Sequence, residues 1–305
     1  MSLRLTLLVS ALVGCQTPPP APEIDGQAAL GYATTQVEFG PRIPGTEPHR
    51  KTGEWIQAQL SERADTVIVQ AWRHRNAQGD TLLLRNFIGR FNPAATRRLL
   101  FLAHWDTKPL ADYDTGARAK LPVPGANDGG SGVAVLLAMA DALKKRAPTI
   151  GVDLLFVDAE DYGTFTPEVD VLLGSKYYAA NPAPGPRPEF AILLDIVGGK
   201  NAQFRKEGHS LTAAPGVVDL VWSTAARVGH GNLFLNESGG AITDDHVPLQ
   251  QAGIRAINII GDFGPSSAYP WWHTADDTPD KLSAEVLAAV GNVAMAVIRE
   301  AKAAN

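Results

Sequence analysis

Histidine and carboxylate side chains at several places in the sequence could together form a catalytic metal site. In chain order they are His104 with Asp106, Asp128, Glu160 with Asp161, Asp195, and His273. Imidazole and carboxylate groups bind zinc without any thiolate, and a catalytic site keeps one coordination position open for the substrate. In the adjacent acidic pair, one carboxylate can bind the metal while its neighbour moves protons. The sequence therefore predicts a zinc enzyme.

Most of these residues follow an expected strand or precede an expected helix. Short apolar runs at 99–103, 152–157, 190–194 and 254–260 are typical of strands buried on both faces, and 66–71 with 82–91 fits a hairpin. Helical spacing predicts helices over 28–62, with a break at 39–45, and over 131–143, 215–228 and 281–303. Strands that alternate with helices predict an α/β fold, with a largely parallel sheet and helices on both faces.

The predicted topology brings the candidate residues together. His104 and Asp106 follow one predicted strand, Glu160 and Asp161 follow a second, and Asp195 follows a third. In an open parallel sheet, ligands bind in a crevice at the carboxyl ends of the strands. We therefore expect these residues, which are distant in sequence, to meet at one edge of the sheet.

Asp128 lies in a glycine-rich segment, 125–132, just before the helix that is expected to begin near Ser131. Glycine residues let the backbone adopt positive φ and approach a metal closely. Taken alone, the segment is equally consistent with an aspartate that caps the helix. Together with the other histidines and carboxylates, the motif favours a metal ligand.

Composition limits the class of partner. The chain has 305 residues, of which 45% are hydrophobic and 19% charged, and these values are ordinary for a globular protein. Its formal net charge of -5 argues against nucleic acid or an anionic membrane surface as the main partner.

The first residues resemble an export signal. An apolar run at 5–13 follows Arg4, is too short to span a bilayer, and ends in a Leu-Val-Gly-Cys sequence like a bacterial lipobox. We predict a signal peptide at 1–14, a lipidated Cys15 with a proline-rich spacer at 15–27, and one catalytic domain at 28–305. The protein would then be an exported lipoprotein that faces the periplasm and contacts the membrane only through its anchor. The alternative is a plain signal peptide with an incidental cysteine.

The motifs, in this order, resemble those of the zinc aminopeptidase and glutaminyl cyclase superfamily. They are His-x-Asp at 104–106, Gly-Ala-x-Asp-x-x-x-Gly at 125–132, the acidic pair, Leu-Leu-Asp at 193–195 and His-Thr at 273–274, with Gly-Pro-Arg at 40–42 as an early marker. The similarity extends from about residue 36 to the end of the chain. It implies a central mixed, largely parallel sheet flanked by helices, in agreement with the pattern of predicted elements.

Two branches of this superfamily imply different metal counts. For the co-catalytic aminopeptidases, the matching zinc ligands are His104, Asp128 as the bridge, Asp161, Asp195 and His273, with Glu160 as the base. For the glutaminyl cyclases, a single zinc is held at the positions of Asp128, Asp161 and His273. Every residue type that two zinc ions need is present, so ligand identity does not separate the branches.

Other residues favour the cyclases. The segment 243–249 resembles the cyclase Asp-Asp-His-x-Pro motif, and aminopeptidases more often carry serine at the position of Asp244. Trp272, directly before His273, matches the cyclase Trp-His-Thr motif, in which the indole forms a wall of the glutamine pocket. Animal cyclases have a further tryptophan soon after the acidic pair, but 162–166 contains none. The candidates to complete the wall are Phe263, Tyr269 and Trp271.

The resemblance implies a glutaminyl-peptide cyclotransferase that converts the N-terminal glutamine of peptides and proteins to pyroglutamate and ammonia. Zinc would be the Lewis acid, Glu160 the general base and then acid, and Asp195 with Asp244 a proton relay. The alternatives are an aminopeptidase with two zinc ions and, disfavoured by the complete ligand set, a binding domain without activity.

Several polar residues receive a structural role or none. His246 is expected to be structural, and His49 and His74 are expected to be exposed because they lie in polar segments. Asp276 and Asp277 could orient the imidazole of His273, or else cap a loop.

Overall fold

The computed structural model describes residues 23–303. The predicted signal peptide, Cys15 and the spacer up to residue 22 lie outside this range. Within residues 23–303, no helix is both long and apolar enough to cross a membrane.

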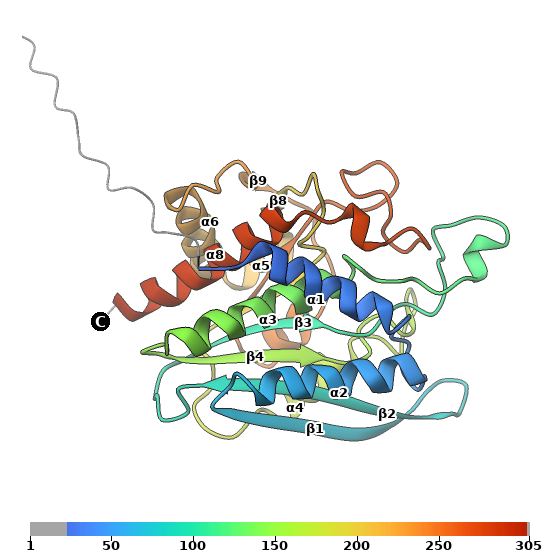
Figure 1. The fold of residues 1–305 in the computed structure, drawn as a ribbon, viewed down its shortest axis with the longest axis horizontal. Helices are drawn as coiled ribbons and strands as arrows, with labels where there is room; N and C mark the ends of the chain where they lie inside the picture. The colour runs from blue at the N-terminus through green and yellow to red at the C-terminus, as the bar shows by residue number, and fades with distance from the viewer. Residues whose placement is uncertain (1–22, 304–305) are drawn as a thin grey trace, which may run out of the picture.

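A six-stranded mixed sheet forms the centre of the molecule, in the strand order β1-β2-β4-β3-β7-β10 (Figure 1). Its strands are β1 (Thr66–Arg75), β2 (Thr81–Phe91), β3 (Arg98–His104), β4 (Gly151–Val157), β7 (Ala191–Asp195) and β10 (Ala256–Ile260). The last four of these are parallel to one another, and β1 and β2 form the predicted antiparallel hairpin at one side. The predicted fold class, a mixed and largely parallel sheet flanked by helices, is confirmed.

Helices cover both faces of the sheet. One face carries α1 (Gly26–Glu38), α2 (Glu47–Ser61), α3 (Gly130–Lys145) and α8 (Ala284–Ala303), of which α1, α2 and α3 lie in front of the sheet in Figure 1. The other face carries α4 (Leu173–Ala180) and α7 (His246–Gln251). Each face of the sheet has its own hydrophobic core, and alternate residues of β3 point into each of them. Leu99 and Phe101 pack on one side, and Leu100 and Leu102 pack on the other. This explains why the buried strands are apolar throughout.

Further elements complete the fold. They are β5 (Thr164–Phe165) with β6 (Glu168–Val169), β8 (Phe204–Lys206) with β9 (Phe234–Ser238), the helices α5 (Gly208–Ala213) and α6 (Pro215–Arg227), and 3-10 turns at Arg118–Lys120 and Pro279–Lys281. The predicted helix over 281–303 begins at Ala284, after the second of these turns.

The glycines before and within the first turn of α3 allow the close approach that the site needs. Gly129 has φ +71°, and a Cβ there would lie 2.7 Å from His104 Cε1. A Cβ on Gly132 would lie 2.1 Å from the carbonyl oxygen of Leu194. The glycine pattern of 125–132 therefore serves packing of the helix against β3 and β7 as well as a left-handed turn next to Asp128.

Candidate active site

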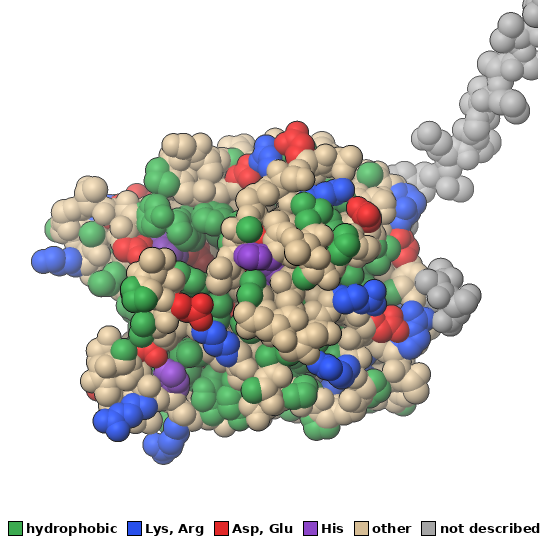
Figure 2. All heavy atoms as spheres, turned by 180° about the vertical axis from the view of Figure 1, so that it is seen from behind, with side chains coloured by type: hydrophobic (Ala, Val, Ile, Leu, Met, Phe, Trp, Pro, Cys, Tyr) green, Lys and Arg blue, Asp and Glu red, His purple; other side chains and the backbone are tan. Residues whose placement is uncertain are grey.

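A pocket of about 520 Å³ opens where the parallel strands end. It is lined by carboxylates, aromatic side chains and threonines: Lys108, Asp112, Tyr113, Asp128, Glu160, Asp161, Thr164, Phe165, Thr166, Asp195, Ile242, Thr243, Asp244, Ile260, Trp272 and His273. Figure 2 shows the molecule hollowed at the end away from the grey segment, where hydrophobic side chains adjoin acidic and histidine side chains. The structure thus brings all seven candidate site residues, predicted from distant parts of the sequence, into one cavity: Asp128, Glu160, Asp161, Asp195, Asp244, Trp272 and His273.

Three of these residues form a group suited to a metal ion. Donor atoms of Asp128, Asp161 and His273 all lie within 4.8 Å of one another. His273 Nε2 is 3.2 Å from Asp161 Oδ2 and 3.6 Å from Asp128 Oδ2. Both of these oxygens are buried, and neither accepts a hydrogen bond from the described residues. Buried carboxylate oxygens without a donor are costly unless a cation compensates them.

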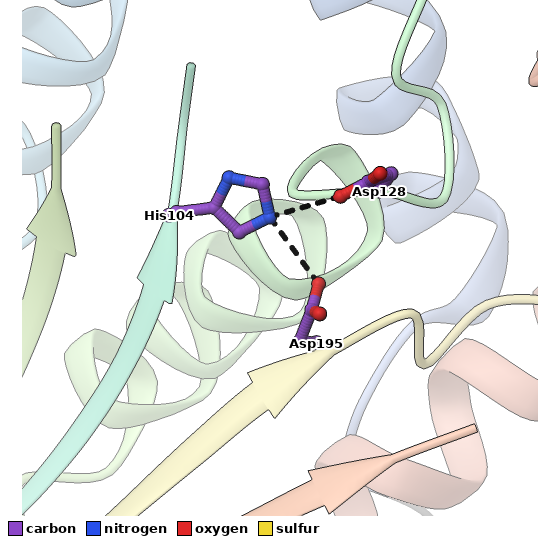
Figure 3. Close-up of side chains that lie close together, drawn as sticks. All are labelled: His104, Asp128 and Asp195. Carbon is purple, nitrogen blue, oxygen red and sulfur yellow. Dashed lines mark hydrogen bonds and ion pairs between the residues drawn. The ribbon is translucent and has the colours of Figure 1, made fainter. Parts of the chain in front are cut away.

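A second group shares Asp128 with the first. His104 Nε2, at the end of β3, is 3.1 Å from Asp128 Oδ1 and 3.3 Å from Asp195 Oδ1 at the end of β7 (Figure 3). Asp128 therefore directs Oδ1 towards His104 and Oδ2 towards His273. This is the arrangement expected of a bridging ligand, and the donor atoms fit one metal ion or two.

Buried charged groups hold the ligand-bearing loops through their backbone. Asp106 accepts hydrogen bonds from the N–H groups of Glu160 and Asp161, at 2.9 and 3.1 Å. Arg42, the early marker of the resemblance, donates to the carbonyl oxygens of Trp105 and Gly125 at 2.9 and 2.6 Å. Burial lowers the pKa of Arg42 to about 10, so the side chain still carries its charge at neutral pH.

Of the two alternatives for Asp276 and Asp277, the structure does not favour the one in which they orient His273. His273 Nδ1 is hydrogen-bonded to Asp112 Oδ1 at 3.0 Å, whereas Asp276 is exposed and pairs with Arg118 at 2.7 Å. Asp277 accepts hydrogen bonds from the N–H groups of Asn127 and Asp128, so it holds the loop of Asp128 rather than the imidazole. No sequence motif pointed to Asp112, because the contact spans 161 residues.

Lys108 contacts a candidate metal ligand, and no sequence motif predicts this contact. Its buried ammonium donates to Asp161 Oδ1 at 3.2 Å and to the carbonyl oxygen of Gly163 at 3.3 Å. One oxygen of Asp161 is therefore engaged by a cation, and the other, Oδ2, faces His273. This contact favours binding of a metal through a single oxygen of Asp161.

The adjacent acids have pKa values displaced in opposite directions. Burial, together with the charges of Asp161 and Asp244, raises the pKa of Glu160 well above its usual range. Burial would also raise the pKa of Asp161, but His273 and Lys108 outweigh it and lower that pKa to about 2. Neighbouring carboxyl groups that differ in this way can divide their roles, one as a permanent anion and one as a proton carrier.

Asp244 lies in a tightly held segment. Burial and the charges of Asp195 and Asp245 raise the pKa of Asp244 to about 8, and its Oδ2 accepts a hydrogen bond from Asn258 at 2.7 Å. Glu207 fixes the same segment, since it accepts a hydrogen bond from the N–H of Ile242 at 2.9 Å and one of its oxygens lies 3.1 Å from His246 Nε2. His246 is therefore structural, as expected.

The aromatic wall differs from the expected one. Trp272 stacks on His273 with ring centroids 3.7 Å apart, and Tyr113 meets the indole edge-on at 4.5 Å. Tyr113 and Phe165 line the pocket with Trp272. The three residues proposed from the sequence are not among the lining residues: Phe263 packs on Trp272 with ring centroids 4.7 Å apart, Tyr269 donates a hydrogen bond to Asp277 at 2.5 Å, and the ammonium of Lys281 lies over the ring of Trp271.

The chain belongs to Peptidase family M28, whose profile matches residues 86–298.

Similar proteins include both cyclases and aminopeptidases. The structure is similar to that of Porphyromonas gingivalis glutaminyl cyclase, with a TM-score of 0.87 and 40% identity, covering 92% of this chain and 100% of that one. The sequence is 28% identical over 270 residues to aminopeptidase YwaD of Bacillus subtilis (strain 168), covering 85% of this chain and 51% of the relative. It is 27% identical over 229 residues to the glutaminyl-peptide cyclotransferase of Bos taurus, covering 65% of this chain and 60% of the relative. The chain thus spans only part of the length of these two relatives.

We expect Asp112, rather than Asp276, to control metal binding through His273. Asp112→Ala removes the acceptor of the His273 Nδ1 hydrogen bond and should weaken metal binding about 10- to 100-fold, the usual cost of losing such a partner. Asp276→Ala is the matched control, because Asp276 pairs only at the surface with Arg118. Metal titration against a chelator checks both variants. Equal affinities in the two variants would show that the hydrogen bond to Asp112 does not matter.

Proposed function

We propose that this protein is a glutaminyl-peptide cyclotransferase, which converts the N-terminal glutamine of peptides and proteins to pyroglutamate and ammonia. The observation that carries the proposal is the buried Asp244, which lines the same pocket as Glu160 and Asp195. Trp272, stacked on a candidate metal ligand, supports it, as does the similarity to a bacterial glutaminyl cyclase over nearly the whole chain.

Asp128, Asp161 and His273 would hold one zinc ion. Their nitrogen and carboxylate donors suit zinc, and the Oδ2 atoms of the two aspartates, which accept no hydrogen bond from the described residues, are the buried polar atoms that a cation would satisfy. When bound there, zinc supplies a Lewis acid for the γ-carbonyl oxygen of the substrate glutamine.

Glu160 is proposed to carry the proton. The α-nitrogen of glutamine forms a bond to its own side-chain carbonyl carbon, and the bond from that carbon to the amide nitrogen breaks. Glu160 takes one proton from the α-amine and returns it to the departing nitrogen, which leaves as ammonia. The raised pKa of Glu160 suits both halves of this task, because it makes the carboxylate a stronger base and keeps its acid form available near neutral pH.

The remaining pocket residues would hold the substrate and support the proton transfer. Burial and the charge of Asp195 raise the pKa of Asp244 to about 8, so Asp244 can hold a proton near neutral pH and take part in a proton relay. Trp272, Tyr113 and Phe165 form an aromatic wall that would keep the glutamine side chain folded back on its own amine. Such pre-organisation lowers the entropic cost of an intramolecular attack.

The second candidate function is an aminopeptidase with two zinc ions. The group formed by His104, Asp128 and Asp195 favours it, since its donor atoms fit a second metal ion, and so does the similarity to an aminopeptidase. In that reaction a water molecule attacks the peptide bond, and a second ion helps to activate it. Metal content and substrate choice separate the two functions.

Substrate choice is tested with two dipeptides. Glutamine-initiated dipeptides should lose ammonia, as detected by mass spectrometry, and leucine-initiated ones should remain uncut. Asp244→Ser should reduce cyclisation about 10²- to 10⁴-fold, the range for loss of a proton-transfer group, and should leave the metal content unchanged. Rapid release of free leucine, with the glutaminyl peptide left uncyclised, would favour the aminopeptidase instead.

The division of labour within the acidic pair gives a second test. Asp161→Ala and His273→Ala should remove bound zinc and activity together, because each loses a proposed ligand. Glu160→Gln should retain zinc, since the amide keeps the shape of the side chain, and should lose nearly all turnover because the amide cannot accept the proton. Zinc content by elemental analysis and kcat are measured on the same samples. A zinc-free Glu160→Gln protein would contradict these assignments.

We also propose that the protein is a lipoprotein anchored through Cys15, with its catalytic part in the periplasm. Glu23 is held by Asn292, whose Oδ1 accepts a hydrogen bond from the Glu23 N–H at 2.8 Å. The helix α1, which begins at Gly26 shortly after Glu23, starts at the end of the molecule away from the carboxyl ends of β3 and β4 (Figure 1), so an anchor that precedes it would leave the pocket accessible to peptides.

Replacement of the cysteine tests the anchor. Cys15→Ser should move the protein from the membrane fraction to the soluble fraction of a bacterial host, because the lipid would have no attachment site. Immunoblots of the two fractions measure the change. The anchor is ruled out if the variant and the unaltered chain distribute in the same way.

A further inference from the structure

His49, expected from the sequence to be exposed, is buried beneath the active site. It lies in the first turns of α2, with 3% of its surface exposed. Its Nε2 lies 2.8 Å from Asp158 Oδ1. Its ring stacks on the indole of Trp105, with ring centroids 4.3 Å apart and an interplanar angle of 14°. One side chain on a helix thus contacts two different loops of the sheet.

Both partners of His49 are adjacent to candidate site residues. Trp105 stands between His104 and Asp106, directly after β3, and Asp158 directly follows β4, two residues before Glu160. A displacement of either partner would therefore be transmitted through one or two residues of backbone to the pocket.

The β2 strand completes the arrangement. Asp158 Oδ2 accepts a hydrogen bond from the N–H of Arg85 at 2.7 Å, and Trp105 Nε1 donates to the carbonyl oxygen of Arg85 at 3.1 Å. Asp158 and Trp105 are thus each fixed to the same residue of β2. His49 links their side chains from the other direction, which leaves neither loop free to shift alone.

The chain after Asp158 needs such support. Ala159 has φ +53°, a left-handed conformation that is unfavourable for alanine and persists only where the surroundings enforce it. This turn is what directs Glu160 and Asp161 towards the pocket. Asp106 holds the turn from its far side through the N–H groups of both residues, and Asp158 holds it from the near side.

We propose that His49 is a positioning residue, whose hydrogen bond to Asp158 sets the placement of Glu160 and Asp161. The inference rests on the proposed function only in taking Asp161 as a metal ligand and Glu160 as the proton carrier. His49 itself does not line the catalytic pocket, so its effect must pass through its two partners, Asp158 and Trp105.

Two replacements separate its two contacts. His49→Phe keeps a ring to stack on Trp105 and removes the donor to Asp158. His49→Gln loses the ring but places an amide nitrogen near the position of Nε2, where it can donate to Asp158. Leu60→Ala is the control, because Leu60 is a fully buried residue of the same helix that packs near Gly89 of β2.

The zinc dissociation constant, the thermal midpoint, kcat and KM are measured for each variant with a glutamine-initiated dipeptide. His49→Phe should weaken zinc binding about 10- to 100-fold and lower kcat more than it raises KM, whereas His49→Gln should stay near the unaltered protein. Leu60→Ala should lower the thermal midpoint and keep the zinc affinity.

Two results would overturn the inference. One is a His49→Phe protein with unchanged zinc affinity and kcat but a lowered thermal midpoint, as in the control. The other is a His49→Gln protein as impaired in zinc binding as His49→Phe. If zinc affinity depends on His49 in this way but the unaltered protein does not cyclise glutamine, the inference stands and the proposed activity fails.

Discussion

The concentration of buried acids at the carboxyl ends of the strands is the constraint on which the site depends. Asp128, Glu160, Asp161 and Asp244 are all almost inaccessible to solvent. Burial raises the pKa values of Asp128, Glu160 and Asp244, whereas cationic neighbours keep that of Asp161 low. Such a cluster must take up either protons or a cation. Protons and metal therefore compete for it, and metal affinity falls as the pH falls.

The same charges influence stability. The pKa of Asp244 is about 8 in the folded protein, compared with an ordinary value of 3.8 for an aspartate side chain. Between these values the folded protein holds a proton that the unfolded chain has released. This group therefore makes the fold less stable as the pH rises through that range. The rest of the fold must supply the free energy that keeps this residue in the pocket, which is expected where a residue serves activity rather than stability.

A second set of buried charges fixes the backbone instead of binding metal. Asp106, Asp277 and Glu207 each accept backbone N–H hydrogen bonds, and Arg42 donates to backbone carbonyl oxygens. Because each charge is compensated by hydrogen bonds to backbone groups, it holds the loops that carry the candidate site residues in place. A buried acid in this protein is thus a ligand candidate only where its oxygens lack a backbone partner.

Some features of the fold and the candidate site could be predicted from the sequence, and others could not. The sheet and its flanking helices could be predicted because apolar runs set the strands, and Asp128 and Asp161 stand close to the ends of elements. His273 lies in the long loop between β10 and the second 3-10 turn, and only the resemblance of its motif to a known family pointed to it. The acceptor for His273 could not be predicted, since Asp112 reaches it along an irregular loop whose path no periodicity encodes. His49 was misplaced for a related reason. A polar residue in a polar helix is expected to be exposed. His49 is nevertheless buried, because its partner Asp158 is a buried carboxylate directly after β4.

The cyclase and aminopeptidase interpretations use the same fold and the same cluster of acids, but the two reactions need different groups to be activated. Hydrolysis needs a water molecule activated beside the peptide bond, and the donor atoms of His104 and Asp195 could help to hold a metal ion for that purpose. Cyclisation brings its own nucleophile, so it needs instead a group that carries a proton between two nitrogens of one substrate. Burial and the charge of Asp161 raise the pKa of Glu160, and Asp244 adds to this only in its ionised form. With a pKa of about 8, Asp244 is mostly protonated at neutral pH, so it can hold and pass on a proton in a way that a serine cannot. Asp244 is not among the candidate metal ligands, so a complete ligand set for two ions is compatible with a reaction that needs only one.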